Sequence, residues 1–291
     1  DTTAKRIISW LSNHHLSYSE SNEEYRSIFD YMIQKQTNHL IYEIKNSKDL
    51  ENKIIGCSAI ILSGLCYKID KNYLNFGLNF LKKITKHSID NQGFTKSRNI
   101  GQQIFYLKYF ILIKEWLKES QVEIPEHIEE TIYYFGQAYA YFWQNTQTSL
   151  LFNGNNISNN KEFDNYLKRL GYKFKNDDKN YGGYTILRNK KICLIMDTGS
   201  SPDFKYSQNY QSGALSFEII SNGKKLISNC GYFKKENQKL NQLSKSSANH
   251  STLIIDDNSS CKFFKRKNDW ILRSGLKISQ NNTTFEKNYW K

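Results

Sequence analysis

Several features that would place a protein in a familiar class are scarce in this sequence. Its five cysteines are odd in number and lie far apart without a C-x-x-C pair, so neither a disulfide scaffold nor a zinc ribbon is indicated. No apolar run reaches the roughly 18 residues of a membrane-spanning helix, which excludes a transmembrane segment of that kind. No basic segment leads into an apolar one, so the sequence shows no export signal.

The common catalytic signatures are also missing. There is no G-x-S-x-G nucleophile motif, no P-loop and no G-x-G-x-x-G, so phosphoryl transfer and hydride transfer are not expected. No histidine and cysteine spacing matches a zinc site. Five of the six histidines precede residue 128, and His250 is the only one after it. His250 stands directly before an apolar run, either as a structural histidine or as one that points into a cleft.

What the sequence does contain indicates a folded protein with unevenly distributed charge. The 291 residues include 20 Tyr, 17 Phe and 5 Trp, which is far more aromatic surface than a disordered chain carries. Residues 1–150 hold 17 basic and 16 acidic side chains, whereas residues 151–291 hold 24 and 12, so the formal charge of +13 lies almost entirely in the second half. A basic surface of this size favours an anionic partner, although a compositional bias towards lysine would produce the same excess.

The first half of the sequence has the periodicity of packed helices. Amphipathic spacing over residues 4–146 predicts about six helices, among them 49–69, 71–84, 100–119 and one from Pro125 to about 144. Asp49 and Ser21 are the expected N-caps, the latter with Glu24 in capping-box spacing.

The second half changes to short apolar runs typical of strands. After one short helix at 161–170, we expect strands at 183–188, 191–197, 214–220, 224–230 and 251–257. Asn222-Gly223 between two of them predicts a tight hairpin, and hairpin-linked strands imply an antiparallel sheet. The expected architecture is a helical domain over 1–155, a connection over 156–179 and an antiparallel β domain over 180–291, with truncation at both ends of the chain.

Several ordered motifs resemble those of the heparinase II/III-like family, which comprises polysaccharide lyases and their relatives. They are ALSFEIISNGKKLISNCG at 214–231, ANHSTLIIDDNSS at 248–260, QGFTKSRN at 92–99 and LLFNG at 150–154. The resemblance implies an incomplete α/α toroid followed by an antiparallel β-sandwich. It also implies a location in the cell envelope or periplasm.

The family chemistry implied by this resemblance is β-elimination on a uronic acid. That reaction needs a donor to the carboxylate, a base for the C5 proton and an acid for the leaving oxygen. By the family pattern, Asn99 is the expected carboxylate donor, Tyr139 or Tyr134 the base and acid, and His250 a further catalytic residue. Substrate-binding roles are expected for Arg98, which either assists Asn99 or supports the loop, and for Gln211 and Asn209.

The sequence departs from the family pattern at the positions where the β domain usually carries histidines. Asn209 and Gln211 occupy those places, and Asn229 stands where a family metal site would need a carboxylate. Amides are weak zinc ligands and cannot act as general bases near neutral pH. We therefore expect no bound zinc and no other cofactor, and full lyase activity becomes less certain.

Three functions remain open at this stage. The leading one is a lyase that cleaves an acidic polysaccharide, and the second is a relative that keeps the fold and binds the glycan without cleaving it. Nucleic-acid binding is the third, but it rests on charge alone, without a recognition helix or RNA-binding motif, so no specific nucleic-acid partner is expected.

Overall fold

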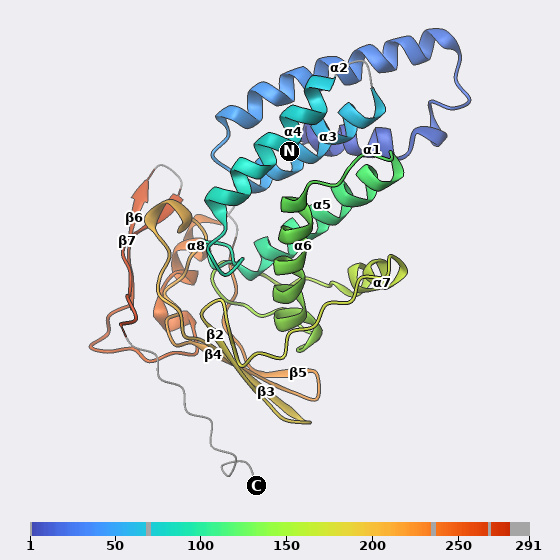
Figure 1. The fold of residues 1–291 in the computed structure, drawn as a ribbon. Coiled ribbons are helices and arrows are strands. Elements are labelled where there is room, and N and C mark those ends of the chain that lie inside the picture. The colour runs from blue at the N-terminus through green and yellow to red at the C-terminus, as the bar shows by residue number, and fades with distance from the viewer. Residues whose placement is uncertain (1, 68–70, 234–236, 267–268, 280–291) are drawn as a thin grey trace. The chain divides into compact units, whose positions relative to one another are not determined.

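The chain divides by its contacts into two compact units, which are described separately. The computed structural model describes residues 2–67, 71–233, 237–266 and 269–279 (Figure 1). The first unit comprises residues 1–95 and 102–138, and the second comprises 96–101 and 139–291. The loop 96–101 thus belongs with the β-rich part of the chain, although its sequence neighbours are helical.

Six α-helices run through the described residues between positions 2 and 139, as the periodicity predicts. They are α1 (Thr2–Ser12), α2 (Glu23–Asn46), α3 (Leu50–Cys66), α4 (Lys71–Ser88), α5 (Ile100–Glu119) and α6 (Glu126–Tyr139). A short π-helical turn, Ala140–Gln144, follows α6. None of the described helices is both long and apolar enough to cross a membrane.

Helix α3 forms the centre of the first unit. Its residues from Ile54 to Leu65 are all buried, because the helix packs against α1, α2 and α4. A helix that is covered on every side needs close backbone contacts. At Gly64 a Cβ would lie only 2.4 Å from the backbone nitrogen of Leu74, so glycine allows α3 and α4 to approach each other.

The two predicted N-caps have different outcomes. Asp49 caps α3 as expected, since its side chain accepts hydrogen bonds from the backbone nitrogens of Glu51 and Asn52. The prediction for Ser21 is wrong. Asn22 caps α2 instead by accepting from the nitrogen of Tyr25 at 2.8 Å, while the Ser21 hydroxyl donates to the carbonyl of Tyr18.

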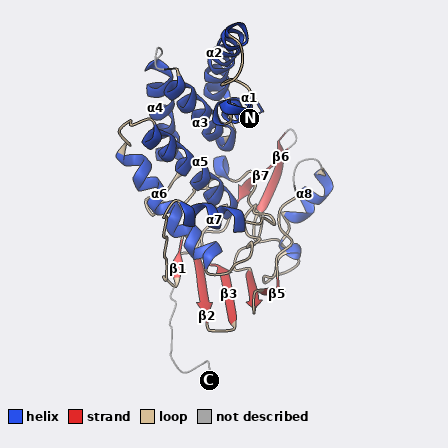
Figure 2. Ribbon diagram, turned by 90° about the vertical axis from the view of Figure 1, so that its right-hand side faces the viewer, coloured by secondary structure: helices blue, strands red, loops and turns tan. Residues whose placement is uncertain are grey.

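The second unit contains a five-stranded antiparallel sheet in the order β1-β2-β3-β4-β5 and a separate hairpin, β6-β7 (Figure 2). The strands are β1 (Asn180–Tyr181), β2 (Tyr184–Arg188), β3 (Ile192–Asp197), β4 (Phe217–Ser221), β5 (Lys224–Ile227), β6 (Lys262–Arg266) and β7 (Asp269–Ser274). Two helices accompany them, α7 (Lys161–Arg169) and α8 (Gln238–Ser244). The predicted hairpin is confirmed: Asn222 and Gly223 connect β4 to β5 with φ of +47° and +75°, as a type I′ turn requires.

The strand predicted at 251–257 is not present, and local side-chain bonding explains why. The hydroxyls of Ser251 and Thr252 donate to the carbonyls of Phe217 and Ala214, which fixes the start of this segment in an irregular conformation. Asp256 and Asp257 then adopt positive φ, which an extended strand does not allow. Only an isolated bridge, between Ile255 and Asn258, forms here.

One face of the five-stranded sheet is buried and carries two acidic residues beside its apolar ones. On β3 the buried positions alternate as Cys193, Ile195 and Asp197, and on β4 they are Glu218 and Ile220. A buried carboxylate is costly unless it is paired and hydrogen-bonded, so both acids must have dedicated partners. The predicted fold class, a helical part followed by an antiparallel β part, is confirmed.

Candidate functional site

The loop 96–101 is fixed to the sheet by the side chain of Arg98. Its Nη2 contacts Asp197 Oδ1 at 2.7 Å and donates to the Gly183 carbonyl at 3.0 Å, while Nη1 donates to the Ser200 carbonyl at 3.2 Å. Burial lowers the pKa of Arg98, but the Asp197 carboxylate outweighs it and raises the pKa overall. These contacts occupy both N–H groups of Nη2 and one of Nη1 within the fold. Of the two predicted roles for Arg98, the geometry matches support of the loop.

Two further side chains complete the surroundings of this ion pair. Asn153 donates through Nδ2 to Asp197 Oδ2 at 2.7 Å and to the Tyr184 hydroxyl at 2.8 Å. Tyr184 in turn donates its hydroxyl to the carbonyl oxygen of Arg98 at 2.8 Å. Arg98 and Asn153 both have positive φ, at +59° and +49°. Such backbone conformations are strained in residues other than glycine and are held here by the network around Asp197.

Asn99 follows Arg98 and lies next to two residues from distant parts of the chain. A Cβ at Gly154 would be 2.8 Å from Asn99 Nδ2 and 2.5 Å from Asn209 Cβ, so these three positions are in close contact. Asn99 itself is 4% exposed, whereas Gly154 and Asn209 are partly exposed. The amide of Asn99 is thus buried next to two partly exposed positions.

Gln211 connects Gly154 to the segment that carries His250. Its Oε1 accepts from the backbone nitrogen of Gly154 at 2.9 Å, and its Nε2 donates to the carbonyls of Gly231 and Ser244, both at 2.8 Å. The side chain is fully buried. Because its oxygen accepts and its nitrogen donates, the Gln211 amide links the three chain segments that contain Gly154, Gly231 and Ser244.

His250 has one nitrogen bonded and the other without a hydrogen bond among the described residues. Its Nε2 lies 3.0 Å from the Ser244 carbonyl, so Nε2 carries the proton and Nδ1 carries the lone pair in the neutral ring. Burial lowers the pKa of His250, although the Ser244 bond and the charge of Asp197 oppose this. The imidazole is therefore neutral at pH 7, with Nδ1 available to accept a proton.

A buried lysine holds the segment that bears Asn209 and Gln211. Lys245 Nζ donates to the carbonyls of Gln208 and Tyr210, each at 2.8 Å, and lies 4.8 Å from the centre of the Phe263 ring. Its residue is only 3% exposed. The buried ammonium group therefore stabilises this turn through two hydrogen bonds to its backbone carbonyls.

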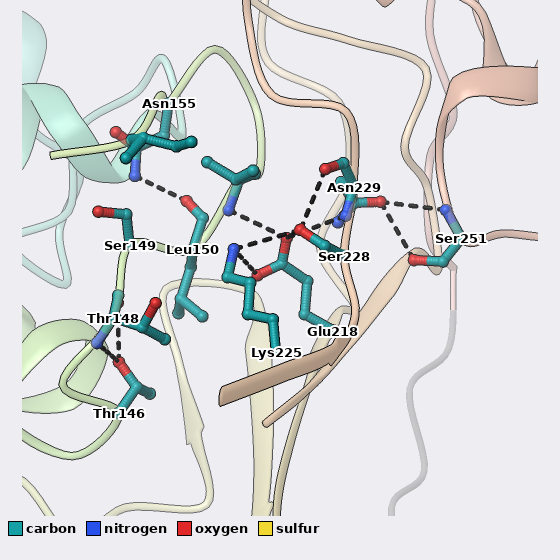
Figure 3. A network of polar contacts seen from close by, with 12 residues as sticks. Thr146, Thr148, Ser149, Leu150, Asn155, Glu218, Lys225, Ser228, Asn229 and Ser251 are labelled. Carbon is teal, nitrogen blue, oxygen red and sulfur yellow. Dashed lines mark hydrogen bonds and ion pairs between the residues drawn. The ribbon is translucent and has the colours of Figure 1, made fainter. Parts of the chain in front are cut away.

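The second buried acid, Glu218, organises the strand end that leads to His250 (Figure 3). Its Oε1 accepts from the backbone nitrogens of Leu151 and Asn229, at 3.2 and 3.0 Å, and its Oε2 pairs with Lys225 at 2.8 Å. Asn229 Oδ1 then accepts from the backbone nitrogen of Ser251 at 3.1 Å. The carboxylate thereby links the loop around residue 151 to the residue next to His250.

The structure gives the two predicted tyrosines different surroundings. Tyr139 is fully buried, and its hydroxyl donates to Asp164 Oδ1 at 2.7 Å while Trp143 Nε1 donates to Oδ2 of the same carboxylate. Burial and the Asp164 charge raise the pKa of Tyr139, which opposes action as a base. Tyr134 belongs to the other unit, is partly exposed, and packs its ring on Gly93.

Five of the seven predicted site residues thus come together in the second unit: Arg98, Asn99, Asn209, Gln211 and His250. No three His, Cys, Asp or Glu side chains in the described part of the chain converge as metal ligands would. The expectation that no zinc binds remains a prediction. His250 is the only histidine in the sequence of residues 139–291.

Sequence reasoning did not identify four residues on which this cluster depends: Asn153, Asp197, Glu218 and Lys245. Two of them had a usable signal. Asp197 ends an apolar strand at an inward position, and Asn153 precedes Gly154 in a turn dipeptide. Lys245 had none, because one lysine among many gives no indication that it is buried.

Comparison with known proteins agrees with this architecture. The family described as "Heparinase II/III-like, C-terminal" matches residues 176–290. Two crystal structures of heparinase III superpose with TM-scores of 0.70 and 0.71 at 16% identity, covering 90% and 88% of this chain and 48% and 44% of theirs. The heparan sulfate lyase HepC from Pedobacter heparinus superposes with a TM-score of 0.66 at 14% identity, covering 93% of this chain and 48% of that one. The chain therefore spans about half the length of the solved structures that it matches, and no curated protein matches its sequence.

Proposed function

On the premise that residues 176–290 form a heparinase II/III-like C-terminal region and that the chain has the fold of heparinase III, we propose that this protein cleaves an acidic polysaccharide by β-elimination. The known structures are those of lyases, and one of them is named for heparan sulfate. The substrate class in this proposal is a uronate-containing glycan, which also matches the basic second half of the chain.

The proposed chemistry uses two polar groups of the cluster, the amide of Asn99 and the imidazole of His250. The Asn99 amide donates to the uronate carboxylate and stabilises the enolate that forms when the C5 proton leaves. His250 Nδ1 accepts that proton, since burial keeps the ring neutral. The electron pair left at C5 forms the C4=C5 double bond, and the bond from C4 to the glycosidic oxygen breaks. That oxygen takes up a proton from solvent water, and the proton on His250 returns to solvent.

The observation that carries this proposal is the continuous polar connection from Asn99 to His250. Asn99 contacts Gly154, Gly154 donates to Gln211, and Gln211 shares the Ser244 carbonyl with His250. Gly154, Asn209 and His250 are the partly exposed members of this cluster.

A second function, glycan binding without cleavage, is favoured by one specific feature. Gln211 stands where the family carries a histidine, and its amide is fully used in structural bonds. If His250 cannot replace the missing base, the same cluster would still bind a carboxylate through amide donors.

Incubation with heparan sulfate and with other uronate polymers separates the two functions. β-Elimination creates a conjugated C4=C5 double bond, so ultraviolet absorbance rises during cleavage and stays flat during binding alone. In the proposal, Asn99→Ala and His250→Ala each lower the rate by about 10² to 10⁴. Lys161→Ala, on the exposed side of α7, is the matched control and keeps the wild-type rate.

The proposal also includes a location. Uronate-containing polymers lie outside the cytoplasm, so we assign the protein to the periplasm or cell envelope. Fractionation of cells that express the full-length gene tests this assignment, and recovery in the cytoplasmic fraction would contradict it.

A further inference from the structure

A group of basic side chains lies at the end of the five-stranded sheet that is remote from the cluster around Asp197. The β3–β4 register pairs Ile192 with Ser221, so the turn between β2 and β3 and the turn between β4 and β5 lie at the same sheet end (Figure 1). These turns and the strand ends beside them carry four exposed basic side chains, here called the hairpin-tip patch: Arg188, Lys190, Lys191 and Lys224.

This patch is strongly positive because almost no acid balances it. Residues 188–191 and 221–224 contain no Asp or Glu. The nearest acidic partner is Asp177, which contacts Arg188 at 2.8 Å and Lys175 at 2.9 Å. Among the described residues, Lys190, Lys191 and Lys224 form no ion pair, so three ammonium groups remain directed at solvent.

The two turns do not depend on the basic side chains for their conformation. Asn189 Oδ1 accepts from the backbone nitrogens of Lys191 and Ile192, at 2.8 and 2.7 Å, and so shapes the first turn. The second turn depends on the positive φ of Asn222 and Gly223. No lysine side chain supports either turn, so the fold gives no structural reason for this concentration of charge.

We propose that the hairpin-tip patch is a second contact for the acidic polysaccharide, which holds the polymer at a distance from the site of cleavage; this inference rests on the proposed function. Asp197 lies six residue steps beyond Lys191 along β3, or about 20 Å of extended strand. A polymer can therefore contact the patch and the cluster together, whereas a short oligosaccharide contacts one of them. The contact is electrostatic, so it increases affinity for long chains and leaves the chemical step unchanged.

The choice of a glycan over a nucleic acid follows from what accompanies the charge. The patch lies on two tight turns of a sheet, without a helix to enter a groove or an aromatic residue in either turn to stack on a base. It also belongs to the same unit as the cluster proposed to bind uronate.

The test compares two triple variants with equal loss of charge. One is Lys190→Ser/Lys191→Ser/Lys224→Ser, and the control is Lys82→Ser/Lys83→Ser/Lys86→Ser, which removes three exposed lysines from α4. Binding to heparan sulfate polymer at low salt should weaken about tenfold in the hairpin-tip variant and less than twofold in the control. The difference should vanish at high salt, and kcat on a tetrasaccharide should be unchanged.

Several results would overturn the proposal. Equal weakening in both variants would mean that total charge matters and position does not. Unchanged polymer binding in the hairpin-tip variant would remove the contact altogether. Weakened binding of a DNA duplex, with heparan sulfate binding intact, would assign the patch to nucleic acid.

The proposed lyase function fails separately from this inference. If neither the wild type nor either variant forms unsaturated product, but polymer binding still depends on the hairpin-tip patch, the second contact is supported and cleavage is contradicted. If product forms and polymer binding ignores the patch, only the second contact falls.

Discussion

Gln211 and His250 donate to the same acceptor, the carbonyl oxygen of Ser244, at 2.8 and 3.0 Å. A glutamine that takes the place of a family histidine is thereby connected to the one accessible imidazole of the β-rich unit. The shared carbonyl fixes which nitrogen of His250 carries the proton, and this leaves Nδ1 as the basic atom. The orientation of His250 therefore depends on the bonding of Gln211.

The ion pair between Arg98 and Asp197 is expected to be important for stability. Asp197→Asn removes a carboxylate that is 1% exposed and leaves the buried guanidinium without its counter-ion, so the free energy of unfolding should fall by about 3 kcal/mol. Asp177→Asn is the matched control, because it breaks the exposed pair with Arg188. Urea unfolding followed by circular dichroism measures both variants. Equal losses in the two would contradict a dominant role for the buried pair.

His250 should titrate below the ordinary histidine value of 6.5, because burial disfavours its charged form. Between the folded pKa and the unfolded pKa of about 6.5, the unfolded chain binds more protons than the folded chain. Within this window the contribution of His250 to the free energy of unfolding therefore increases as the pH rises, and it is lost as the pH falls towards the folded pKa. The acidic limb of the kcat/KM profile should have its midpoint below 6.5 for the same reason. NMR titration of the imidazole measures the pKa directly.

A histidine variant checks the assignment of that pH dependence. His250→Gln keeps a donor to the Ser244 carbonyl but cannot titrate, so it should flatten the part of the stability profile below pH 6.5 that His250 causes. An imidazole pKa at or above 6.5 in the folded wild-type protein would contradict the account.

Glu218 is expected to couple stability to the geometry around His250. Glu218→Gln weakens the bonds from Leu151 and Asn229 and leaves Lys225 without its charge partner, which should cost about 2 kcal/mol in urea unfolding. It should also shift the NMR signals of His250, through Asn229 and Ser251 (Figure 3). Glu129→Gln, at the exposed pair with Lys114, serves as the control and should change neither quantity.

Two phenylalanine variants distinguish the roles of Tyr139 and Tyr134. Tyr139→Phe removes the hydroxyl that donates to Asp164, so it should lower the free energy of unfolding by about 1 to 3 kcal/mol with kcat within a few-fold of wild type. If Tyr134 transfers a proton in the reaction, Tyr134→Phe should lower kcat at least a hundredfold without loss of stability. A large fall in kcat for Tyr139→Phe at unchanged stability would return the proton-transfer role to Tyr139.

The parts of the fold with a local cause could be predicted from the sequence. The apolar spacing around Ile54 and Leu65 indicated α3, and Asn222-Gly223 indicated the β4–β5 hairpin, because each depends on neighbouring residues alone. The segment 251–257 has the same apolar composition as a strand, but hydroxyl bonds to residues 214 and 217 decide its conformation, and those partners are remote in sequence.

The candidate site shows the same limit. Motif resemblance led to the predicted roles of Asn99 and His250. It did not indicate Asp197 or Lys245, whose contacts are with residues about 100 and 35 positions away along the chain. A buried ion pair or a buried ammonium group becomes recognisable only when its partners are in place. The residues proposed to contact the substrate lie in motifs that the sequence shows, whereas the partners of Asp197 and Lys245 are known only from the structure.

The most direct test of the central claim is the mass of the products that the full-length protein releases from heparan sulfate or another uronate polymer. Elimination breaks the glycosidic bond without adding water, so the fragments should carry an unsaturated uronate and be one water molecule lighter than hydrolysis products. His250→Ala should slow their formation by about 10² to 10⁴. Release of saturated fragments, or of none from any uronate polymer that the protein binds, would contradict cleavage by β-elimination.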